Sequence, residues 1–265
     1  MYAFEFHRAS DIDDALKQLG ADDEAQLIAG GQTLLQSLRQ RLAMPSTLVD
    51  LGGLTELAGI ERDGDALNIG AMTRHAEVAG AAAVHDAIPA LAVLAGGIGD
   101  AQVRNMGTLG GSIANNDPAA DYPAGLVGLG ATVVTTEREI AADDFFTGMF
   151  ETALGEHELI LGVRFPVPRR AGYVKFPQPA SRYVLVSVMV AETDEGVRVA
   201  VSGAGPCVFR VPEMERALAA DFRPEALDGI RVDPGGLNED LHATPEYRAH
   251  LVGVIARRAV AAALS

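Results

Sequence analysis

The sequence has 265 residues, enough for one large domain or for two to three small ones. Hydrophobic residues make up 48% and charged residues 22%, as in an ordinary globular protein, and tryptophan is absent. The formal net charge of −15 argues against a nucleic-acid backbone or an anionic membrane as the main partner. A small anionic ligand stays possible, because backbone N–H groups can hold phosphates without a basic surface.

The chain has a single cysteine, Cys207, which excludes an internal disulfide framework and any zinc or iron–sulfur site built from several of its own cysteines. We expect Cys207 to be a small buried apolar residue. The N-terminus MYAFEFHRASD lacks a charged segment followed by an apolar run, and no run approaches the roughly 18 apolar residues of a membrane span. These features predict a cytoplasmic protein with no integral membrane segment.

The first part of the chain predicts a β-α-β-α-β unit. YAFEF begins as a strand, and Asp11 can cap a helix over 11–20. EAQLIAGG predicts a buried strand that ends in the glycine pair Gly30–Gly31. A helix over 33–42 follows, and STLVDL is the next strand. Four leucines lie along one side of that second helix: Leu34, Leu35, Leu38 and Leu42.

The middle of the chain alternates strands with short helices. ALNIGAMTRHAEV predicts a strand and then a helix from about Thr73, and IPALAVLAGGIG predicts a helix from about Pro89. The segment 102–124, QVRNMGTLGGSIANNDPAADYPA, is poorly suited to a helix or a central strand and is expected to lie against a ligand. After it, GLVGLGATVVTTEREI predicts a helix end and a hairpin, DDFFTGMF a short helical piece, and ELILGVRFPVP a strand.

The composition changes at PVPRRAG, residues 166–172, which predicts a linker. Beyond it, SRYVLVSVMVAE and VRVAVSGAG predict two strands joined by a DEG turn, and VPEMERALAA and TPEYRAHLVGVIARRAVAAALS predict amphipathic helices. The order of elements indicates an α+β protein. We expect two N-terminal lobes, 1–56 and 57–168, and a C-terminal sheet-plus-helix domain, 169–265.

Two glycine-rich turns carry the candidate binding chemistry. AGGQTLL, residues 29–35, lies between a strand and a helix, where glycine lets a ligand approach the backbone and unpaired N–H groups can hold a phosphate. Gln32 and Thr33 add hydrogen-bonding side chains. The motif matches neither G-x-G-x-x-G nor the P-loop, and taken alone it favours a tight turn that binds nothing, because Gly-Gly turns are common.

TLGGSIANNDPAAD, residues 108–121, is predicted to be a second turn of the same kind. Its neutral polar side chains include Asn116, and it carries the carboxylates Asp117 and Asp121. Carboxylates repel a diphosphate but accept hydrogen bonds from the hydroxyl groups of a ribityl or ribose chain. The two segments together favour a flat, diphosphate-bridged cofactor between two lobes over the alternative of a polar surface loop.

Several segments of the sequence resemble the FAD-binding medium subunit of molybdenum hydroxylases. They are AGGQTLLQSLRQRL, STLVDL, IGAMTRHAEV and above all IGDAQVRNMGTLGGSIANNDPAADYPA. The family includes the flavoprotein subunits of carbon monoxide dehydrogenase-type enzymes and the FAD domain of xanthine dehydrogenase. The resemblance runs from about Phe4 to the C-terminal helix. It implies a two-lobed FAD-binding domain of the vanillyl-alcohol-oxidase/PCMH type, followed by a C-terminal domain of antiparallel sheet and helix.

The resemblance also implies which residues bind the cofactor. The turn 29–34 resembles the first pyrophosphate loop of the family, and Thr108 opens the second, in which many relatives have asparagine at the position of Ser112. Asn115 and Asp121 match positions that hold the phosphate-to-ribityl part of FAD. The full set implied is Ala29, Gly30, Gly31, Gln32, Thr33, Leu34, Ile98, Thr108, Gly110, Gly111, Ser112, Asn115, Asp121, Ile160, Lys175 and Tyr183.

Four of these residues are expected near the flavin ring or at the ends of the cofactor. Ile98 corresponds to a residue packed on the flavin side, and Ile160 to one near the dimethylbenzene or adenine end. Lys175 falls where the family has a lysine near the flavin pyrimidine, and a cation there would stabilise the charge of reduced flavin. A solvated surface lysine is the alternative. Tyr183 is a candidate to cover the ring or gate access to it, with core packing as the alternative.

The histidines show no metal-ligand spacing, and we expect them to be solvated or on helix surfaces. They are His7, His75, His85, His157, His242 and His250. No metal site is predicted in this chain. Some relatives insert a cysteine-bearing loop for an extra [4Fe–4S] cluster, which a chain with Cys207 alone cannot build.

By resemblance, the chain is an FAD-binding electron-transfer subunit of a heteromeric molybdenum hydroxylase. Substrate is oxidised at a molybdopterin centre on a large partner subunit. Electrons pass through [2Fe–2S] clusters on a small partner to FAD in this chain, and then to an external acceptor. The cofactor carries the chemistry, so no catalytic acid, base or nucleophile is expected here. The expected assembly is a dimer of heterotrimers.

Two alternatives remain open at this point. The first is a self-sufficient flavin oxidoreductase of the same superfamily, which a small-molecule donor would reduce without partner subunits. The second is a flavin-free structural or interaction homologue, which would stay colourless with added FAD.

Overall fold

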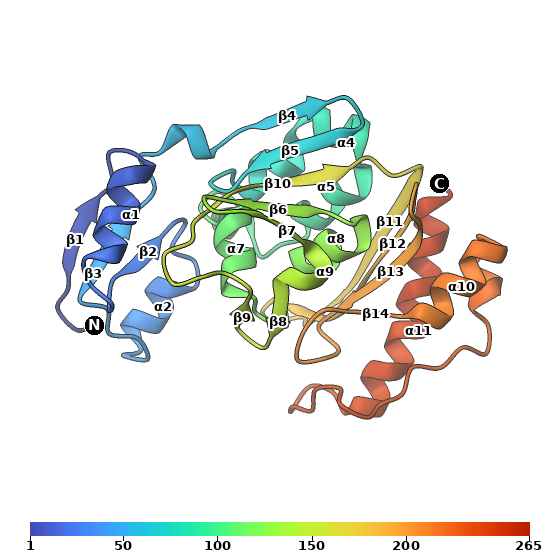
Figure 1. Cartoon of the computed structure of the whole chain (residues 1–265). Coiled ribbons are helices and arrows are strands. Elements are labelled where there is room, and N and C mark those ends of the chain that lie inside the picture. Colours follow the sequence, from blue (N-terminus) through green and yellow to red (C-terminus); the bar gives the residue numbers. More distant parts are fainter.

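Three larger β-sheets, each built from a successive part of the chain, organise the molecule (Figure 1). The computed structural model describes residues 1–265. Helices and mainly antiparallel sheets occupy separate layers, so the predicted α+β class is confirmed. No helix combines the length and the apolar character needed to cross a membrane.

The first sheet has three parallel strands joined by two helices. In spatial order the strands are β1 (Glu5–Arg8), β3 (Thr47–Asp50) and β2 (Gln26–Ile28), and the helices are α1 (Ile12–Gly20) and α2 (Leu34–Arg39). The predicted β-α-β-α-β unit is confirmed. The Asp11 side chain accepts a hydrogen bond from the Asp14 N–H and caps α1, as expected.

Two details of this first sheet differ from the sequence expectation. The second helix is shorter than 33–42: it ends at Arg39, so Leu42 lies beyond it and is 77% exposed. β2 was expected to be buried but is exposed to half-buried. The reason is that Leu27 and Ile28 line an open cleft rather than a closed core.

The second sheet is antiparallel and is closed by a strand from far along the chain. Its spatial order is β4 (Ile60–Asp63), β5 (Ala66–Gly70), β10 (Ile160–Pro166), β6 (Thr132–Thr135) and β7 (Glu139–Ala141). β10 pairs with β5 on one side and with β6 on the other. The shorter elements around it are η1 (Thr55–Leu57), α3 (His75–Gly80), α4 (Ala82–Ala87), α5 (Pro89–Gly96), α9 (Ala142–Phe145), β8 (Phe146–Gly148) and β9 (Glu151–Thr152).

The segment 102–124 contains helices, so the prediction that it forms none is wrong. The helices that overlap it are α6 (Ala101–Arg104), α7 (Leu109–Asn115) and α8 (Tyr122–Leu129). Caps compensate for the poor helix formers in this segment. The Asp100 side chain accepts from the Val103 N–H at the start of α6, and the Thr108 hydroxyl accepts from the Gly111 N–H at the start of α7.

The third sheet is an antiparallel meander covered on both faces. Its strands are β11 (Arg170–Pro177), β12 (Val184–Thr193), β13 (Gly196–Ser202) and β14 (Phe209–Arg210). The helices that follow are α10 (Pro212–Ala220), η2 (Pro224–Leu227) and α11 (Pro245–Ala263). The predicted linker 166–172 is wrong in extent, since β10 ends at Pro166 and β11 begins at Arg170.

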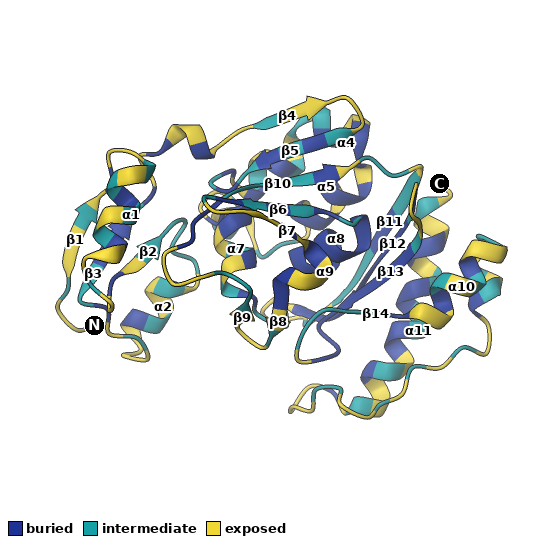
Figure 2. Ribbon diagram, viewed as in Figure 1, coloured by how far each residue is buried: buried dark blue, intermediate teal, exposed yellow.

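Helix α8 lies between the second and third sheets. It packs on β12 and β13 on one side and on β10 and α5 on the other, and every residue in it is buried. Figure 2 shows this helix and β12 as a continuous buried layer through the middle of the molecule. The N-terminal end of α8, at Asp121, is therefore held by both sheets.

Candidate functional site

A cleft of about 690 Å³ lies between the first sheet and the second. One wall is β2 with the turn 29–34. The other walls come from α7 and the residues that flank it, from the segment 154–160 before β10, and from residues 181–183 before β12. This volume is within the range of sites that bind small molecules and cofactors. Both glycine-rich segments therefore face one site, although the first follows a strand of the first sheet and the second forms a helix beside the second sheet.

Nearly all the residues expected to bind the cofactor line this cleft. Those that do are Ala29, Gly30, Gly31, Gln32, Thr33, Leu34, Ile98, Thr108, Gly110, Gly111, Ser112, Asn115, Asp121, Ile160 and Tyr183. Lys175 is not in the lining but lies directly behind it, bonded to Asp121. The structure thus places these residues around one cleft, and the contacts of these residues with a cofactor remain predictions.

The turn 29–34 presents an unbroken row of free main-chain donors. None of its N–H groups donates a hydrogen bond to another protein atom. Gly31 has φ of +68°, a left-handed conformation that glycine adopts without strain, and it redirects the chain from β2 into α2. Free N–H groups at the start of a helix suit the oxygens of an anion. This turn therefore has the geometry expected from the sequence.

The segment at Thr108 differs, because its main-chain donors are already used. The N–H groups of Leu109 and Gly110 bond to the carbonyl oxygens of Thr73 and Ala71, and that of Gly111 bonds to the Thr108 hydroxyl. The prediction of a second turn with free amides is therefore wrong. What faces the cleft is the polar side of α7, where Thr108, Ser112 and Asn115 lie on one helix face.

Two glycines in these turns allow protein segments to approach one another. A β-carbon on Gly30 would lie 2.0 Å from the Met106 carbonyl oxygen, in the loop before α7. A β-carbon on Gly110 would lie 2.6 Å from that of Ala71. Both distances are impossible contacts, so Gly30 allows the two walls of the cleft to approach each other, and Gly110 allows α7 to pack on the end of β5. From the sequence, we expected glycine at these positions only because a ligand approaches the backbone. The structure shows that close packing of protein segments also requires glycine there.

Asp121 is a buried charged group in the cleft lining. Its carboxylate accepts from the Tyr173 hydroxyl at 2.7 Å and pairs with the Lys175 ammonium at 2.9 Å. Lys175 also donates to the Gly97 carbonyl oxygen at 3.1 Å. Burial raises the pKa of Asp121, while the Lys175 charge and the Tyr173 hydroxyl oppose that rise. The alternative of a solvated surface lysine is wrong, because the Lys175 side chain is only 9% exposed.

His75 is a cleft residue that the sequence reasoning missed. It was expected on a solvated surface, but it is 4% exposed and its Nδ1 has no hydrogen-bond partner. Its ring lies 5.4 Å from that of Tyr122, whose buried hydroxyl is also unpartnered. Burial, with a smaller effect of the Arg104 charge, lowers the pKa of His75 to about 4. One local signal was available, since the strand before it and the apolar helix after it both predict a buried junction.

Cys207 is half-buried rather than buried, so the sequence expectation was wrong in degree. Its thiol donates to the Phe146 carbonyl oxygen at 3.5 Å. The Asn116 amide lies 3.8 Å from its sulfur and also holds the turn between β8 and β9, through the carbonyl oxygens of Gly148 and Glu151. Cys207 thus packs outside the cleft lining.

Comparisons with known proteins agree with this geometry. Residues 2–168 match the family described as the FAD binding domain in molybdopterin dehydrogenase. The nicotine 6-hydroxylase medium subunit of Paenarthrobacter nicotinovorans is 35% identical, over 97% of this chain and 96% of that protein. The carbon monoxide dehydrogenase medium chain of Hydrogenophaga pseudoflava is 32% identical, over 98% of this chain and 96% of that protein.

The solved structures extend the similarity to the whole fold. A chain of the carbon monoxide dehydrogenase from Hydrogenophaga pseudoflava that lacks the Mo-pyranopterin moiety superposes with a TM-score of 0.90 at 30% identity. The match covers 99% of this chain and 98% of that chain. The similarity therefore includes the third sheet and α11 as well as the two sheets that form the cleft.

Proposed function

This chain belongs to the family of FAD-binding domains of molybdopterin dehydrogenases, and we propose that it is the electron-transfer subunit of a molybdenum hydroxylase complex. Its cofactor is FAD, and it is a flavoprotein subunit of a molybdenum-dependent oxidoreductase. In the proposal, a small partner subunit with [2Fe–2S] clusters delivers electrons to the flavin site. A large partner with molybdopterin oxidises the substrate, the complex is a cytoplasmic dimer of heterotrimers, and an external acceptor removes the electrons.

The free N–H row of residues 29–34 is the observation that carries this proposal. Phosphate oxygens accept hydrogen bonds from such a row without help from cations, which suits a chain whose net charge is −15. The hydroxyl of Ser112 and the amide of Asn115 lie across the cleft and suit the ribityl and phosphate oxygens. Ile98 and Ile160 add apolar surface for rings. The residues present therefore fit FAD.

Bound FAD supplies the one- and two-electron chemistry, and the chain's own residues bind and orient it. The turn 29–34 would hold the diphosphate. Asp121 would accept from the ribityl chain, with its carboxylate fixed in place by Tyr173 and Lys175. Tyr183, which is 49% exposed at the cleft wall, would limit access of water to the ring.

Purification of the native complex tests the proposal. A tagged copy of the full chain, expressed in its own host, is expected to bring down two further subunits, with molybdenum, iron and FAD in the preparation. Added substrate is then expected to bleach the flavin absorbance only while the partners are present. A chain that elutes alone, retains FAD and is reduced by a small-molecule donor would instead support the self-sufficient oxidoreductase. Failure to retain or bind FAD at all would contradict the family function.

A further inference from the structure

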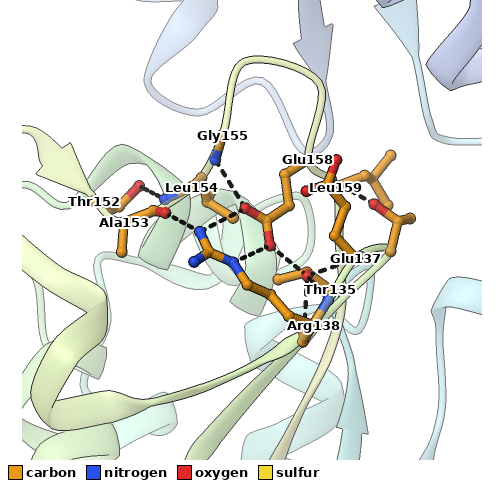
Figure 3. Close-up of polar contacts among 10 residues, drawn as sticks. Thr135, Glu137, Arg138, Thr152, Ala153, Leu154, Gly155, Glu158 and Leu159 are labelled. Carbon is orange, nitrogen blue, oxygen red and sulfur yellow. Dashed lines mark hydrogen bonds and ion pairs between the residues drawn. The ribbon is translucent and has the colours of Figure 1, made fainter.

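An ion pair between an exposed arginine and a buried glutamate ties one wall of the cleft to the neighbouring hairpin (Figure 3). The Glu158 carboxylate accepts from the Arg138 guanidinium through Nε and Nη2, both at 3.1 Å, and from the Gly155 N–H at 2.8 Å. Its side chain is fully buried, whereas that of Arg138 is 53% exposed. Arg138, with help from the other donors, holds the pKa of Glu158 at about 2, so the carboxylate is ionised at neutral pH.

The hydroxyl of Thr135 completes the set of donors to this carboxylate. It lies 2.6 Å from Glu158 Oε1 and 2.9 Å from the Arg138 carbonyl oxygen, but a hydroxyl has a single proton to donate. The ionised carboxylate is the stronger acceptor and the closer one, so the proton belongs to that contact. Glu158 thus receives four hydrogen bonds, and no lone pair of its carboxylate is left to face an apolar environment.

The same hairpin turn also holds the rest of the loop between β9 and β10. Arg138 Nη2 donates to the Ala153 carbonyl oxygen at 2.6 Å. At the other end of the loop, the Leu159 N–H bonds to the Thr136 hydroxyl at 3.1 Å, and the Thr136 N–H bonds to the Leu159 carbonyl oxygen at 2.9 Å. These anchors come from residues 135–138, at the turn between β6 and β7, and one more comes from Phe145, whose carbonyl oxygen accepts from the Ala153 N–H at 2.9 Å. The turn therefore supplies most of the contacts that position the loop.

This loop is also one wall of the cleft. Five of its residues are in the lining, together with Ile160 at the start of β10: Leu154, Gly155, Glu156, Glu158 and Leu159. The Glu158 carboxylate is turned inward, toward Arg138 and Gly155 (Figure 3), so it cannot be a ligand group of the cofactor. A residue that lines the site but uses all of its polar atoms to hold the loop has a positional role.

We propose that Arg138 and Glu158 are positioning residues for FAD, which fix the loop 153–159 at the distance from the turn 29–34 that the bound cofactor requires. The inference rests on the proposed function, because it assigns the cleft to FAD. Neither residue touches the cofactor. Both act through the main chain of Ala153 and Gly155.

The pair joins two connections, the β6–β7 turn and the β9–β10 loop, and its Glu158 side chain is fully buried. Loss of the pair is therefore expected to lower stability as well as affinity for FAD, while Leu154 and Leu159 keep the loop packed against the apolar clusters. Loss of one partner leaves the other charge without its main contact, and Arg138 can then turn into solvent. The loop would loosen around the two ends that remain bonded to Phe145 and Thr136.

The test measures the dissociation constant for FAD of the full chain in the Arg138→Ala and Glu158→Ala variants and in the double variant. Each single variant is expected to bind FAD about tenfold more weakly, which corresponds to about 1.4 kcal/mol. The double variant is expected to match the singles, because the two residues act as one unit. Amide hydrogen exchange of a peptide that covers 153–159 should become faster in all three.

A second ion pair on the same sheet provides the matched control. Arg164 and Glu139 form a bidentate pair on β10 and β7, both side chains are substantially exposed, and neither lines the cleft. Arg164→Ala and Glu139→Ala are expected to leave the FAD dissociation constant within about twofold of the wild-type value.

The outcomes separate this inference from the proposed function. Wild-type affinity in the Arg138 and Glu158 variants, with the loop exchanging faster, would overturn the positioning role. Additive losses in the double variant would also overturn it. A wild-type chain that binds no FAD would refute the proposed function itself. If Glu158→Ala fails to fold, Arg138→Lys decides, because it keeps the charge but loses the fork that joins Glu158 to Ala153.

Discussion

Asp121 shows how much one side chain depends on contacts that lie far away in the sequence. It ends the acidic, asparagine-rich segment and was expected to accept from a sugar-like chain. In the structure its carboxylate is shared among the cleft, Tyr173 and Lys175, and the latter two come from β11. A charged pair this deeply buried is stable only while both partners are present.

Lys175→Met is expected to lower the free energy of unfolding by about 3 kcal/mol at pH 8, because it leaves Asp121 buried without its counter-ion. Burial already raises the pKa of Asp121, and loss of the lysine raises it further. A raised pKa stabilises the fold below the unfolded value of 3.8, and this stability is lost as pH rises through the folded pKa. The deficit should therefore shrink at pH 4.5, as urea unfolding at both pH values will show.

The matched variant Asp121→Asn/Lys175→Met removes both charges at once. It should be less destabilised at pH 8 than Lys175→Met alone, since no buried charge is left unpaired. A Lys175→Met deficit that is the same at both pH values, or a double variant that is worse than the single, would contradict this account of the pair.

His75 is expected to make stability depend on pH in the opposite direction, with stability lost as the pH falls. Its pKa is depressed to about 4 from 6.5, so the unfolded chain binds a proton more readily than the folded one. Stability from this residue is present above the unfolded pKa and is lost as pH falls toward the folded value. Between pH 7 and pH 5 we expect a loss of about 2 kcal/mol that is absent from His75→Phe. Urea unfolding measures it, with His157→Gln, at an exposed position, as the control.

At the scale of elements, the two glycine-rich segments are less alike than their sequences. The first ends a strand and leaves its amides free, while the second is a capped helix whose amides are bonded to Ala71 and Thr73. The sequence could not separate these cases, because the acceptors of the second segment lie on another element. A glycine pair indicates that another group comes close to the backbone, but only the fold shows whether that group is a ligand or another part of the protein.

Gly30→Ala tests the contact between the walls of the cleft. The new methyl group would overlap the backbone of Met106 and Gly107, so we expect the turns to separate and stability to fall by about 1–3 kcal/mol, together with weaker FAD binding. Chemical denaturation and an FAD titration measure the two effects. Gly20→Ala, at the end of α1 with open space around it, should change neither by much. Equal behaviour of the two variants would show that the walls are free to move apart.

At the scale of the whole molecule, local patterns predicted local pairings. The β-α-β-α-β unit, the β6–β7 hairpin and the β12–β13 hairpin each follow from periodicity and turn residues over a short stretch of sequence. The pairing of β10 with β5 does not, because it joins 160–166 to 66–70 and no local signal specifies it. β11 was hidden behind the prolines and arginines of a segment that was taken for a linker.

The site residues also fall into those that a local pattern predicts and those that depend on tertiary contacts. The residues of the turn 29–34 could be found from the glycine pair between a strand and a helix, whereas Ile98, Ile160 and Tyr183 came only from the resemblance. The burial of His75, the Lys175–Asp121 pair and the Arg138–Glu158 pair all depend on tertiary packing. The sequence could name Asp121, but it could not show that Asp121 pairs with Lys175 or that Arg138 pairs with Glu158, because both partners of each pair are residue types common on surfaces.

The central place of β10 sets an order of events during synthesis. The strands of the first sheet are complete once residue 50 has left the ribosome, so the turn 29–34 can form early. β5 and β6 have no common neighbour until residues 160–166 emerge, and the loop that faces the turn emerges immediately before them. In the proposed arrangement, enclosure of FAD would therefore wait for this strand, and in a nascent chain stalled before it the turn 29–34 would face an unfinished wall.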